Sequence, residues 1–142
     1  MRVKKIYVVD SSVAVKWLNS QSEKYTNQSD KILKDVQENK SCIMMPELAK
    51  YEVGNALFNK QASLQNTIAS LGTCYSIPIQ FVPQDLKQAQ SAMEIAYENK
   101  ITFYDASFMA LAKEQKADLI TDNPKHQKKK VKGLRVISLK DY

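Results

Sequence analysis

The sequence has few of the residues on which several common kinds of site depend. Its single histidine, His126, lies in a lysine-rich stretch, so a Ser-His-Asp triad or a zinc site with histidine ligands is poorly supported. Its three glycines form no phosphate-binding loop, because neither the G-x-G-x-x-G nor the P-loop pattern occurs. No apolar run approaches the ~20 residues that a membrane-spanning helix needs. We therefore expect neither a nucleotide-binding loop nor an association with a membrane.

Cysteine is also scarce, and the two cysteines, Cys42 and Cys74, lie far apart in the chain. Apolar or hydroxyl neighbours surround each, so we interpret both as small buried hydrophobic residues. A disulfide is the alternative, but nothing else in the sequence indicates secretion. The apolar run behind the basic N-terminus is too short for the core of a signal peptide and meets Asp10 too soon. These features predict a cytoplasmic protein.

The composition is that of an ordinary globular protein with an excess of positive charge. The 142 residues, 44% hydrophobic and 25% charged, fit a single domain that spans 1–142. A domain of this size buries enough surface to fold without a disulfide or a structural metal. The net charge of +6 favours a polyanionic partner such as nucleic acid, although such a charge also serves solubility alone.

Short apolar runs alternate with helical patterns along the chain. The sequence predicts strands at residues 6–9, 41–45, 75–82, 117–121 and 134–139. It predicts helices at residues 13–18, 24–39, from Pro46 onward, 61–71, 84–99 and 104–115. In the helix at 84–99, the expected buried stripe consists of Leu86, Ala89, Met93 and Ala96. Because no hairpin signal separates the strands, the alternation favours a parallel sheet with helices on both faces.

Four carboxylates stand out by their sequence context. Asp10 and Asp122 each follow directly on a predicted strand, at the edge of the sheet where open α/β proteins bind ligands. Glu52 lies at the border of a helix face that should be mostly apolar, and Asp105 lies among large apolar residues. Asp118 is a rival for the site, but it begins its strand. We therefore expect Asp118 at the opposite end of the sheet, in a structural role.

Each of these acids also has a purely structural explanation. Asp10, Asp105 and Asp122 could be helix N-caps, and Glu52 could simply reach solvent. As a group, however, they have no arginine nearby, because Arg2 and Arg135 are the only two in the chain. Buried carboxylates without partners are costly, and a divalent cation such as Mg²⁺ or Mn²⁺, which prefers oxygen ligands, would offset their repulsion. Hydrolysis at phosphorus is the chemistry that such a centre performs well.

Four segments, taken in order, resemble the PIN-domain ribonucleases. They are Val8–Ser12, Tyr51–Leu57, Tyr104–Ser107 and Leu119–Asn123, and the resemblance covers nearly the whole chain. The size is similar to that of the VapC-type toxins of toxin–antitoxin pairs. The resemblance implies an α/β fold, a three-layer α/β/α sandwich with a central parallel sheet of four or five strands, as a single PIN-like domain over 1–142. It also implies a Mg²⁺- or Mn²⁺-dependent endoribonuclease with an RNA substrate, a small antitoxin protein as partner, and a homodimer.

The resemblance assigns catalysis and metal binding to four carboxylates, Asp10, Glu52, Asp105 and Asp122. The last of these either adds a fourth ligand or holds the metal through water. In the implied mechanism, a metal-activated water attacks the scissile phosphate in line. Ser12 matches the hydroxyl that forms a hydrogen bond within the acidic cluster of the family, and Thr121 or Asn123 is expected to help in the same way.

Lysines follow the fourth carboxylate closely. The candidates for contacts with the RNA backbone are Lys125, Lys128, Lys129 and Lys130. A solvated loop is the alternative interpretation of this run of charge.

Two other functions stay open on the sequence alone. One is a non-catalytic RNA- or protein-binding module on the same fold, with the acids as helix caps. The other is a haloacid-dehalogenase-like phosphatase, which also begins with a strand that ends in aspartate. That family needs a second acid two residues after the first, and here the position is occupied by Ser12.

Overall fold

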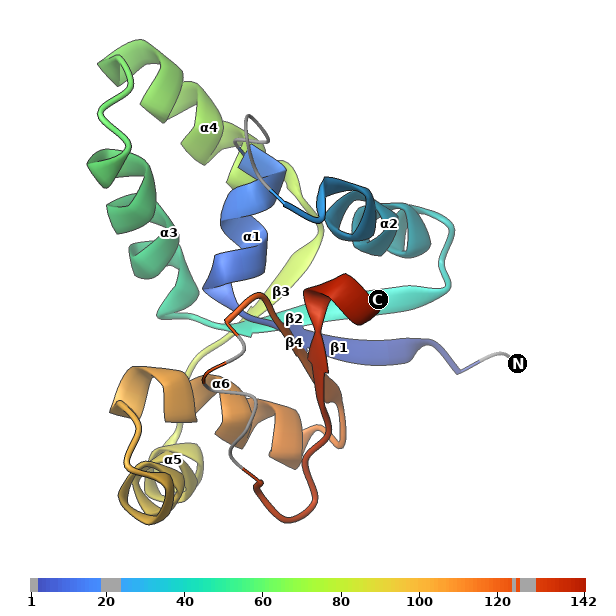
Figure 1. The fold of residues 1–142 in the computed structure, drawn as a ribbon, viewed down its shortest axis with the longest axis vertical. Helices are drawn as coiled ribbons and strands as arrows, with labels where there is room; N and C mark the ends of the chain where they lie inside the picture. The colour runs from blue at the N-terminus through green and yellow to red at the C-terminus, as the bar shows by residue number, and fades with distance from the viewer. Residues whose placement is uncertain (1–2, 19–23, 124, 126–129) are drawn as a thin grey trace.

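A five-stranded parallel sheet forms the centre of the molecule (Figure 1). The computed structural model describes residues 3–18, 24–123, 125 and 130–142. Within them the strand order is β3-β2-β1-β4-β5. The strands are β1 (Lys5–Val9), β2 (Ser41–Pro46), β3 (Ile79–Val82), β4 (Asp118–Thr121) and β5 (Val136–Ser138). Because every pairing is parallel, the carboxyl ends of all strands meet at one edge. This confirms the predicted parallel sheet.

Helices cover both faces of the sheet, so the fold is the expected three-layer α/β/α sandwich (Figure 1). On one side lie α1 (Ser11–Leu18), α2 (Thr26–Gln37), α3 (Ala49–Asn59) and α4 (Leu64–Ser76). On the other lie α5 (Leu86–Asn99) and α6 (Phe103–Glu114). A short 3₁₀ helix, η1 (Leu139–Asp141), follows β5 and contacts α2. None of the helices in the described part of the chain is long and apolar enough to cross a bilayer.

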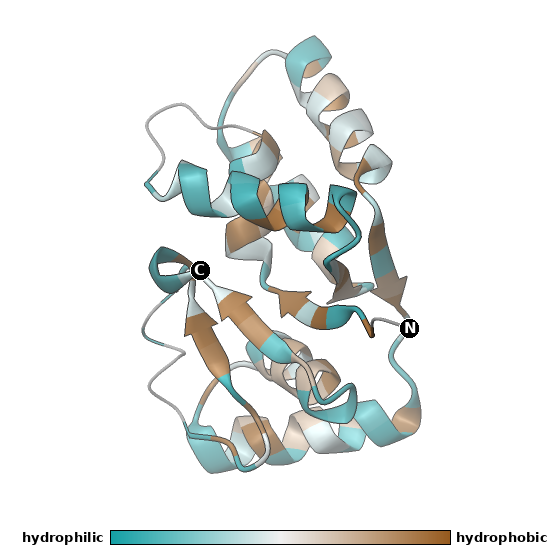
Figure 2. Cartoon of the chain, turned by 90° about the vertical axis from the view of Figure 1, so that its right-hand side faces the viewer, coloured by the Kyte–Doolittle hydropathy of each residue, from teal (hydrophilic) through white to brown (hydrophobic). Residues whose placement is uncertain are grey.

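The core lies between the central strands and the helices that cover them. Val8, Val9 and Ile120 are fully buried in β1 and β4. Every side chain from 106 to 112 in α6 is buried, because this helix lies between the sheet and α5. In Figure 2 the strands are the most hydrophobic segments, while polar residues occupy the outward faces of the helices. Because both faces of the sheet are buried, the sequences of its strands are continuous apolar runs.

The predicted start of α3 was wrong. Pro46 is the last residue of β2, and α3 begins at Ala49. The strand extends this far because Pro46 pairs with Val82 of β3, and the amide of Glu47 donates a hydrogen bond to the carbonyl of Val82 at 3.0 Å. The pairing of β2 with β1 has already stopped at Met44, so the missing amide hydrogen of Pro46 breaks no bond on that side.

The predicted end of α4 was also wrong. The helix continues through Gly72 to Ser76, so Tyr75 and Ser76 are helical and β3 begins only at Ile79. Gly72 has open space around its Cα, and a helical glycine costs only about 1 kcal/mol relative to alanine. The actual stop is set by Pro78, which forces the preceding residue, Ile77, out of the helical region to φ −69° and ψ 135°.

The buried stripe of α5 is displaced from the predicted one. Leu86 and Met93 are 73% and 47% exposed, and the buried residues are Ala92, Ile95 and the correctly predicted Ala96. The sequence contains apolar residues on two adjoining faces of α5, and only contact with α6 selects between them. The predicted inward residues of α6 are confirmed as buried, and they are Ala106, Met109, Ala110 and Ala112.

The two cysteines follow the expectation in part. Both are free thiols, so they form no disulfide with each other. Cys74 is buried, as predicted, while Cys42 is only half-buried. Burial raises the pKa of the Cys74 thiol, which keeps it in its unreactive protonated form.

Candidate functional site

Asp10 is fixed at the carboxyl edge of the sheet by backbone bonds on both sides. Its amide donates to the carbonyl of Ile120 at 2.9 Å, so the pairing of β1 with β4 reaches this residue. Its carbonyl accepts hydrogen bonds from the amides of Val13 and Ala14, which open helix α1. The strand and the helix therefore fix the backbone position from which the Asp10 side chain extends.

Two hydroxyls hold the carboxylate of Asp10. Its Oδ2 accepts a hydrogen bond from Ser12 Oγ at 2.7 Å and another from Thr121 Oγ1 at 3.0 Å. The same hydroxyls accept bonds from the next turn of chain, since the amide of Asp122 donates to Ser12 Oγ and the amide of Asn123 donates to Thr121 Oγ1. This network ties the end of β1 to the end of β4. Asn123 joins it through its backbone.

Glu52 lies in the first turn of α3 and is half-buried. Its Oε1 accepts a hydrogen bond from Ser11 Oγ at 2.9 Å. Burial, and then the negative charges of Asp10 and Asp105, raise the pKa of the Glu52 carboxyl, and the hydrogen bond from Ser11 opposes them only in part. The carboxylates of Asp10, after β1, and of Asp105, in α6, therefore both act on Glu52 at this edge.

Asp105 occupies the first turn of α6, but it is not the cap of that helix. The N-cap is Thr102, whose Oγ1 accepts a hydrogen bond from the amide of Asp105 at 3.0 Å. The sequence left open that Asp105 is the N-cap of this helix, but Thr102 has that role. Asp105 is half-buried, on the side of the sheet opposite α3.

The fourth carboxylate, Asp122, pairs with a lysine that sequence reasoning missed. Its Oδ2 lies 3.1 Å from the Nζ of Lys16 in α1, and that nitrogen also donates to the carbonyl of Lys24 at 2.9 Å. The Lys16 side chain is 4% exposed. The only signal in the sequence was a charged residue within the apolar run of α1.

We call Asp10, Glu52, Asp105 and Asp122 together the acidic site. In the side-chain positions of the structure, no three His, Cys, Asp or Glu residues within the described ranges are arranged to hold a metal ion. The chemistry of the donors nevertheless suits a hard divalent cation. They are half-buried oxygen donors, and burial, followed by the charges of Asp10 and Asp105, raises the pKa of Glu52.

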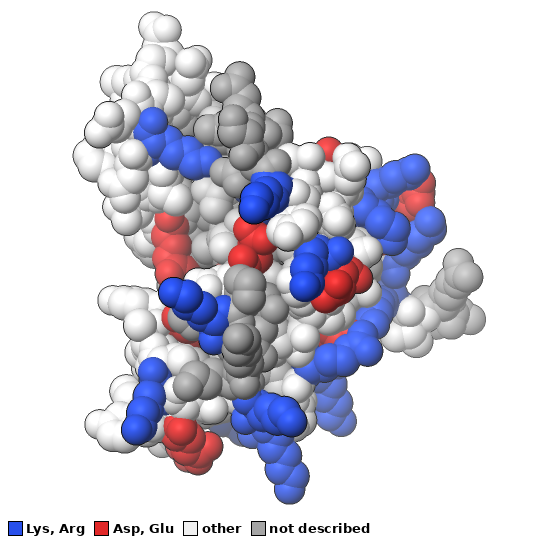
Figure 3. Space-filling model, in the orientation of Figure 1, with Lys and Arg blue, Asp and Glu red and all other residues white. Residues whose placement is uncertain are grey.

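Positive charge surrounds the acidic side chains at this face. In Figure 3, acidic residues lie in the hollow between the α3–α4 end and the α5–α6 end of the molecule, with lysines on the surfaces around it. Of the lysines that follow Asp122, Lys125 and Lys130 are exposed. Lys128 and Lys129 lie outside the described residues, as does His126.

Asp118 is remote from the acidic site, as predicted. It begins β4, at the opposite end of that strand from Asp122, and pairs with Arg135 at 2.7 Å and Lys5 at 3.1 Å. Its partial burial raises the carboxyl pKa, but the hydrogen bonds from the two cations outweigh this, so that the pKa is lowered. These ion pairs support the structural role expected from the sequence.

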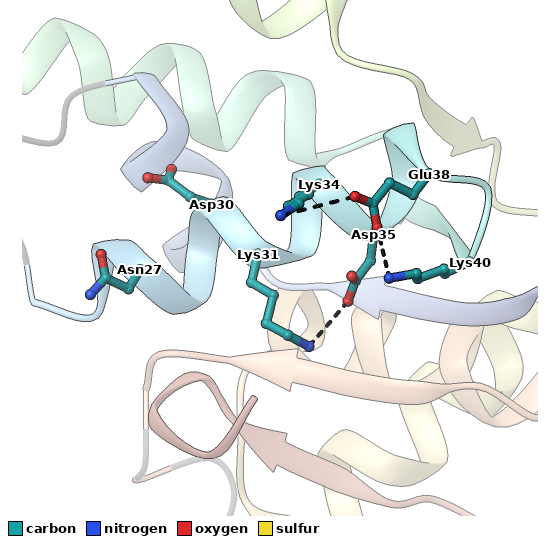
Figure 4. Close-up of a pocket in the computed structure, with 7 residues that line it drawn as sticks. All are labelled: Asn27, Asp30, Lys31, Lys34, Asp35, Glu38 and Lys40. Carbon is teal, nitrogen blue, oxygen red and sulfur yellow. Dashed lines mark hydrogen bonds and ion pairs between the residues drawn. The ribbon is translucent and has the colours of Figure 1, made fainter.

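Charged residues also line a pocket of about 450 Å³ beside α2 (Figure 4). Its charges pair with each other rather than with a missing ligand. Lys31 lies 3.4 Å from Asp35, and Glu38 lies 2.7 Å from Lys40. We therefore do not assign a function to this pocket.

Fold and site together define an α/β/α protein with carboxylates gathered at the carboxyl edge of a parallel sheet. The family model of the PIN domain matches residues 7–132. The chain therefore belongs to the PIN domain family.

Known structures agree with this assignment of the fold. VapBC2 from Rickettsia felis, bound to a DNA fragment from its promoter, superposes with a TM-score of 0.73 at 17% identity, over 94% of this chain and 98% of that one. PAE2754 from Pyrobaculum aerophilum gives 0.67 at 24% identity, over 97% and 93%. VapC20 from Mycobacterium tuberculosis, a toxin that cleaves the sarcin-ricin loop, gives 0.62 at 14% identity, over 80% and 86%. A comparison with curated protein sequences gives no match.

Proposed function

We propose that this protein is a Mg²⁺- or Mn²⁺-dependent endoribonuclease and acts as the toxin of a toxin–antitoxin pair. The observation that carries the proposal is the gathering of carboxylates at one edge of the sheet. Glu52 accepts a hydrogen bond from Ser11, the residue next to Asp10, and its pKa is raised by burial and then by the charges of Asp10 and Asp105. A protein that uses these acids only as caps has no need to bring them together. The family assignment supports nuclease chemistry, and the similarity to VapC20 supports RNA as the substrate class.

Asp10, Glu52 and Asp105 would hold the cation, and Asp122 would contribute through water. When bound, the cation activates water for attack on phosphorus and stabilises charge on the phosphate. The hydroxyls then have clear tasks. Those of Ser12 and Thr121 orient Asp10, and that of Ser11 orients Glu52.

The exposed Lys125 and Lys130 would bind the RNA backbone beside the acidic site, through contacts that weaken with salt. A small antitoxin protein and a second copy of this chain are the proposed protein partners. Several solved structures with the same fold are toxin–antitoxin complexes, which supports the first of these partners. Homodimer formation is a proposal from the resemblance, and a sedimentation experiment tests it.

The decisive experiment is cleavage of total cellular RNA by the purified protein in Mn²⁺, in Mg²⁺ and in EDTA. Asp10→Asn should abolish metal-dependent cleavage, because it removes a carboxylate charge from the acidic site. Asp118→Asn is the matched control, since it makes the same chemical change at the opposite end of β4 and should cleave like the unmodified protein. Equal cleavage by the unmodified protein and Asp10→Asn would refute the proposal. Binding of RNA without any cleavage would favour a non-catalytic module.

A further inference from the structure

Lys16 is the one charged side chain in the described part of the chain that is buried. Lysine is rarely buried to this extent unless its ammonium group is paired, because removing the charge from water is costly. Here the Nζ atom lies 3.1 Å from Asp122 Oδ2 and 2.9 Å from the carbonyl oxygen of Lys24. The ammonium group is therefore held between a carboxylate of the acidic site and the backbone.

The position of this ammonium group follows from the network at the sheet edge. Helix α1 starts directly after Asp10, and Asp122 directly follows β4. Ser12 Oγ links the two, since it donates to Asp10 Oδ2 and accepts from the amide of Asp122. Of the two acids that the Ser12 hydroxyl links, Lys16 pairs with Asp122.

The other carboxylates form a separate group. Asp10 accepts hydrogen bonds from Ser12 and Thr121, and Glu52 accepts one from Ser11, the residue that follows Asp10. The acidic site is therefore divided. Hydroxyl groups hold the carboxylates of Asp10 and Glu52, whereas the carboxylate of Asp122 pairs with the buried ammonium group of Lys16.

We propose that Lys16 is a positioning residue that takes the place of a second divalent cation, so that the acidic site binds a single metal ion through Asp10, Glu52 and Asp105. This inference rests on the proposed metal-dependent function. The ammonium group compensates the charge of Asp122 and occupies the oxygen that would otherwise be a ligand. Asp122 then keeps the end of β4 in place without contacting the metal directly.

Calorimetric titration of the purified full chain with Mn²⁺ alone tests the assignment without any measurement of activity. The unmodified protein should bind one ion, and Asp10→Asn should lower the affinity at least tenfold. Asp122→Asn should change it by less than threefold, because the residue is not a ligand. Lys16→Met, which keeps most of the side-chain volume, releases Asp122 and should raise the number of bound ions from one to two.

The double variant Lys16→Met/Asp122→Asn removes both charges and should again bind one ion, which covers the case in which Lys16→Met alone does not fold. Two ions bound by the unmodified protein, or a tenfold loss of Mn²⁺ affinity in Asp122→Asn, would overturn the role of Lys16 and leave the proposed nuclease intact. Unchanged Mn²⁺ binding in Asp10→Asn would overturn both proposals.

Discussion

Replacement of Ser12 by alanine should destabilise the fold and not only disturb the acidic site. The Ser12 hydroxyl donates to Asp10 Oδ2 at 2.7 Å and accepts from the amide of Asp122 at 3.1 Å. It therefore links the residue that ends β1 to the residue that follows β4. Alanine removes both bonds at once without changing the backbone preferences of the first turn of α1 by much.

The expected cost follows from these two bonds. A hydrogen bond to a charged group contributes about 1.5–3 kcal/mol, and a buried amide without a partner costs about 1–3 kcal/mol. Ser12 is half-buried, so water can replace part of what is lost, and we expect a net loss of about 2 kcal/mol in the free energy of unfolding. For a protein near this size, such a loss lowers Tm by roughly 4–8 °C.

Urea denaturation at pH 7 in EDTA measures the effect. Ser76→Ala is the matched control, because the Ser76 hydroxyl is exposed and donates only to the carbonyl of Thr73 in its own helix. We expect this control to cost less than about 0.5 kcal/mol, as exposed substitutions usually do. If Ser12→Ala were no more destabilising than Ser76→Ala, the Ser12 hydroxyl would not hold the two strand ends together.

Three further outcomes test the charges. Burial and neighbouring carboxylates raise the pKa of Glu52, so its ionised form destabilises the fold as the pH rises above 4.5. Glu52→Gln should therefore raise the urea midpoint in EDTA at pH 7 but not at pH 4. Equal midpoints for the variant and the unmodified protein at pH 7 would contradict this. Arg135 lowers the pKa of Asp118 against the effect of partial burial, and this gives stability above pH 3.8 that is lost as the pH falls through the folded-state pKa. Asp118→Asn should therefore lose less stability than the unmodified protein between pH 5 and pH 2. Denaturation curves taken across that range measure the difference. Lys125→Ala/Lys130→Ala should reduce the slope of log affinity for single-stranded RNA against log salt by about 0.7 for each lysine that contacts a phosphate, and an unaltered slope in filter binding would exclude these contacts.

The arrangement of Asp10 and Asp122 could be predicted because it depends on strands alone. Both residues follow apolar runs, and parallel strands end at one edge of a sheet. That argument needed no knowledge of side-chain positions. The positions of Glu52 and Asp105 were harder to predict, since each lies in the first turn of a helix. The sequence of a helix alone does not determine how the helix is oriented against the sheet. The apolar context of these two acids singled them out as candidates, and the family resemblance then assigned them to the same site as Asp10.

The errors in the fold arose where a neighbour decides the local structure. Pro46 suits a helix start, but pairing with Val82 keeps it in β2. Gly72 suits a helix end, yet α4 continues until the restriction imposed by Pro78. In both places the local preference is worth about as much as a single contact, so a neighbouring strand or proline is enough to reverse it.

Lys16 shows a different limit of the sequence argument. The case for a metal began with carboxylates that have no arginine near them in the chain. A cation can also reach such a site through the fold, and Lys16 does so because α1 starts directly after Asp10 and contacts β4. The charge that the proposed metal ion would balance is therefore smaller than the number of acids indicates. Three carboxylates need less compensation than four, and this is the physical reason to expect one divalent cation at the site.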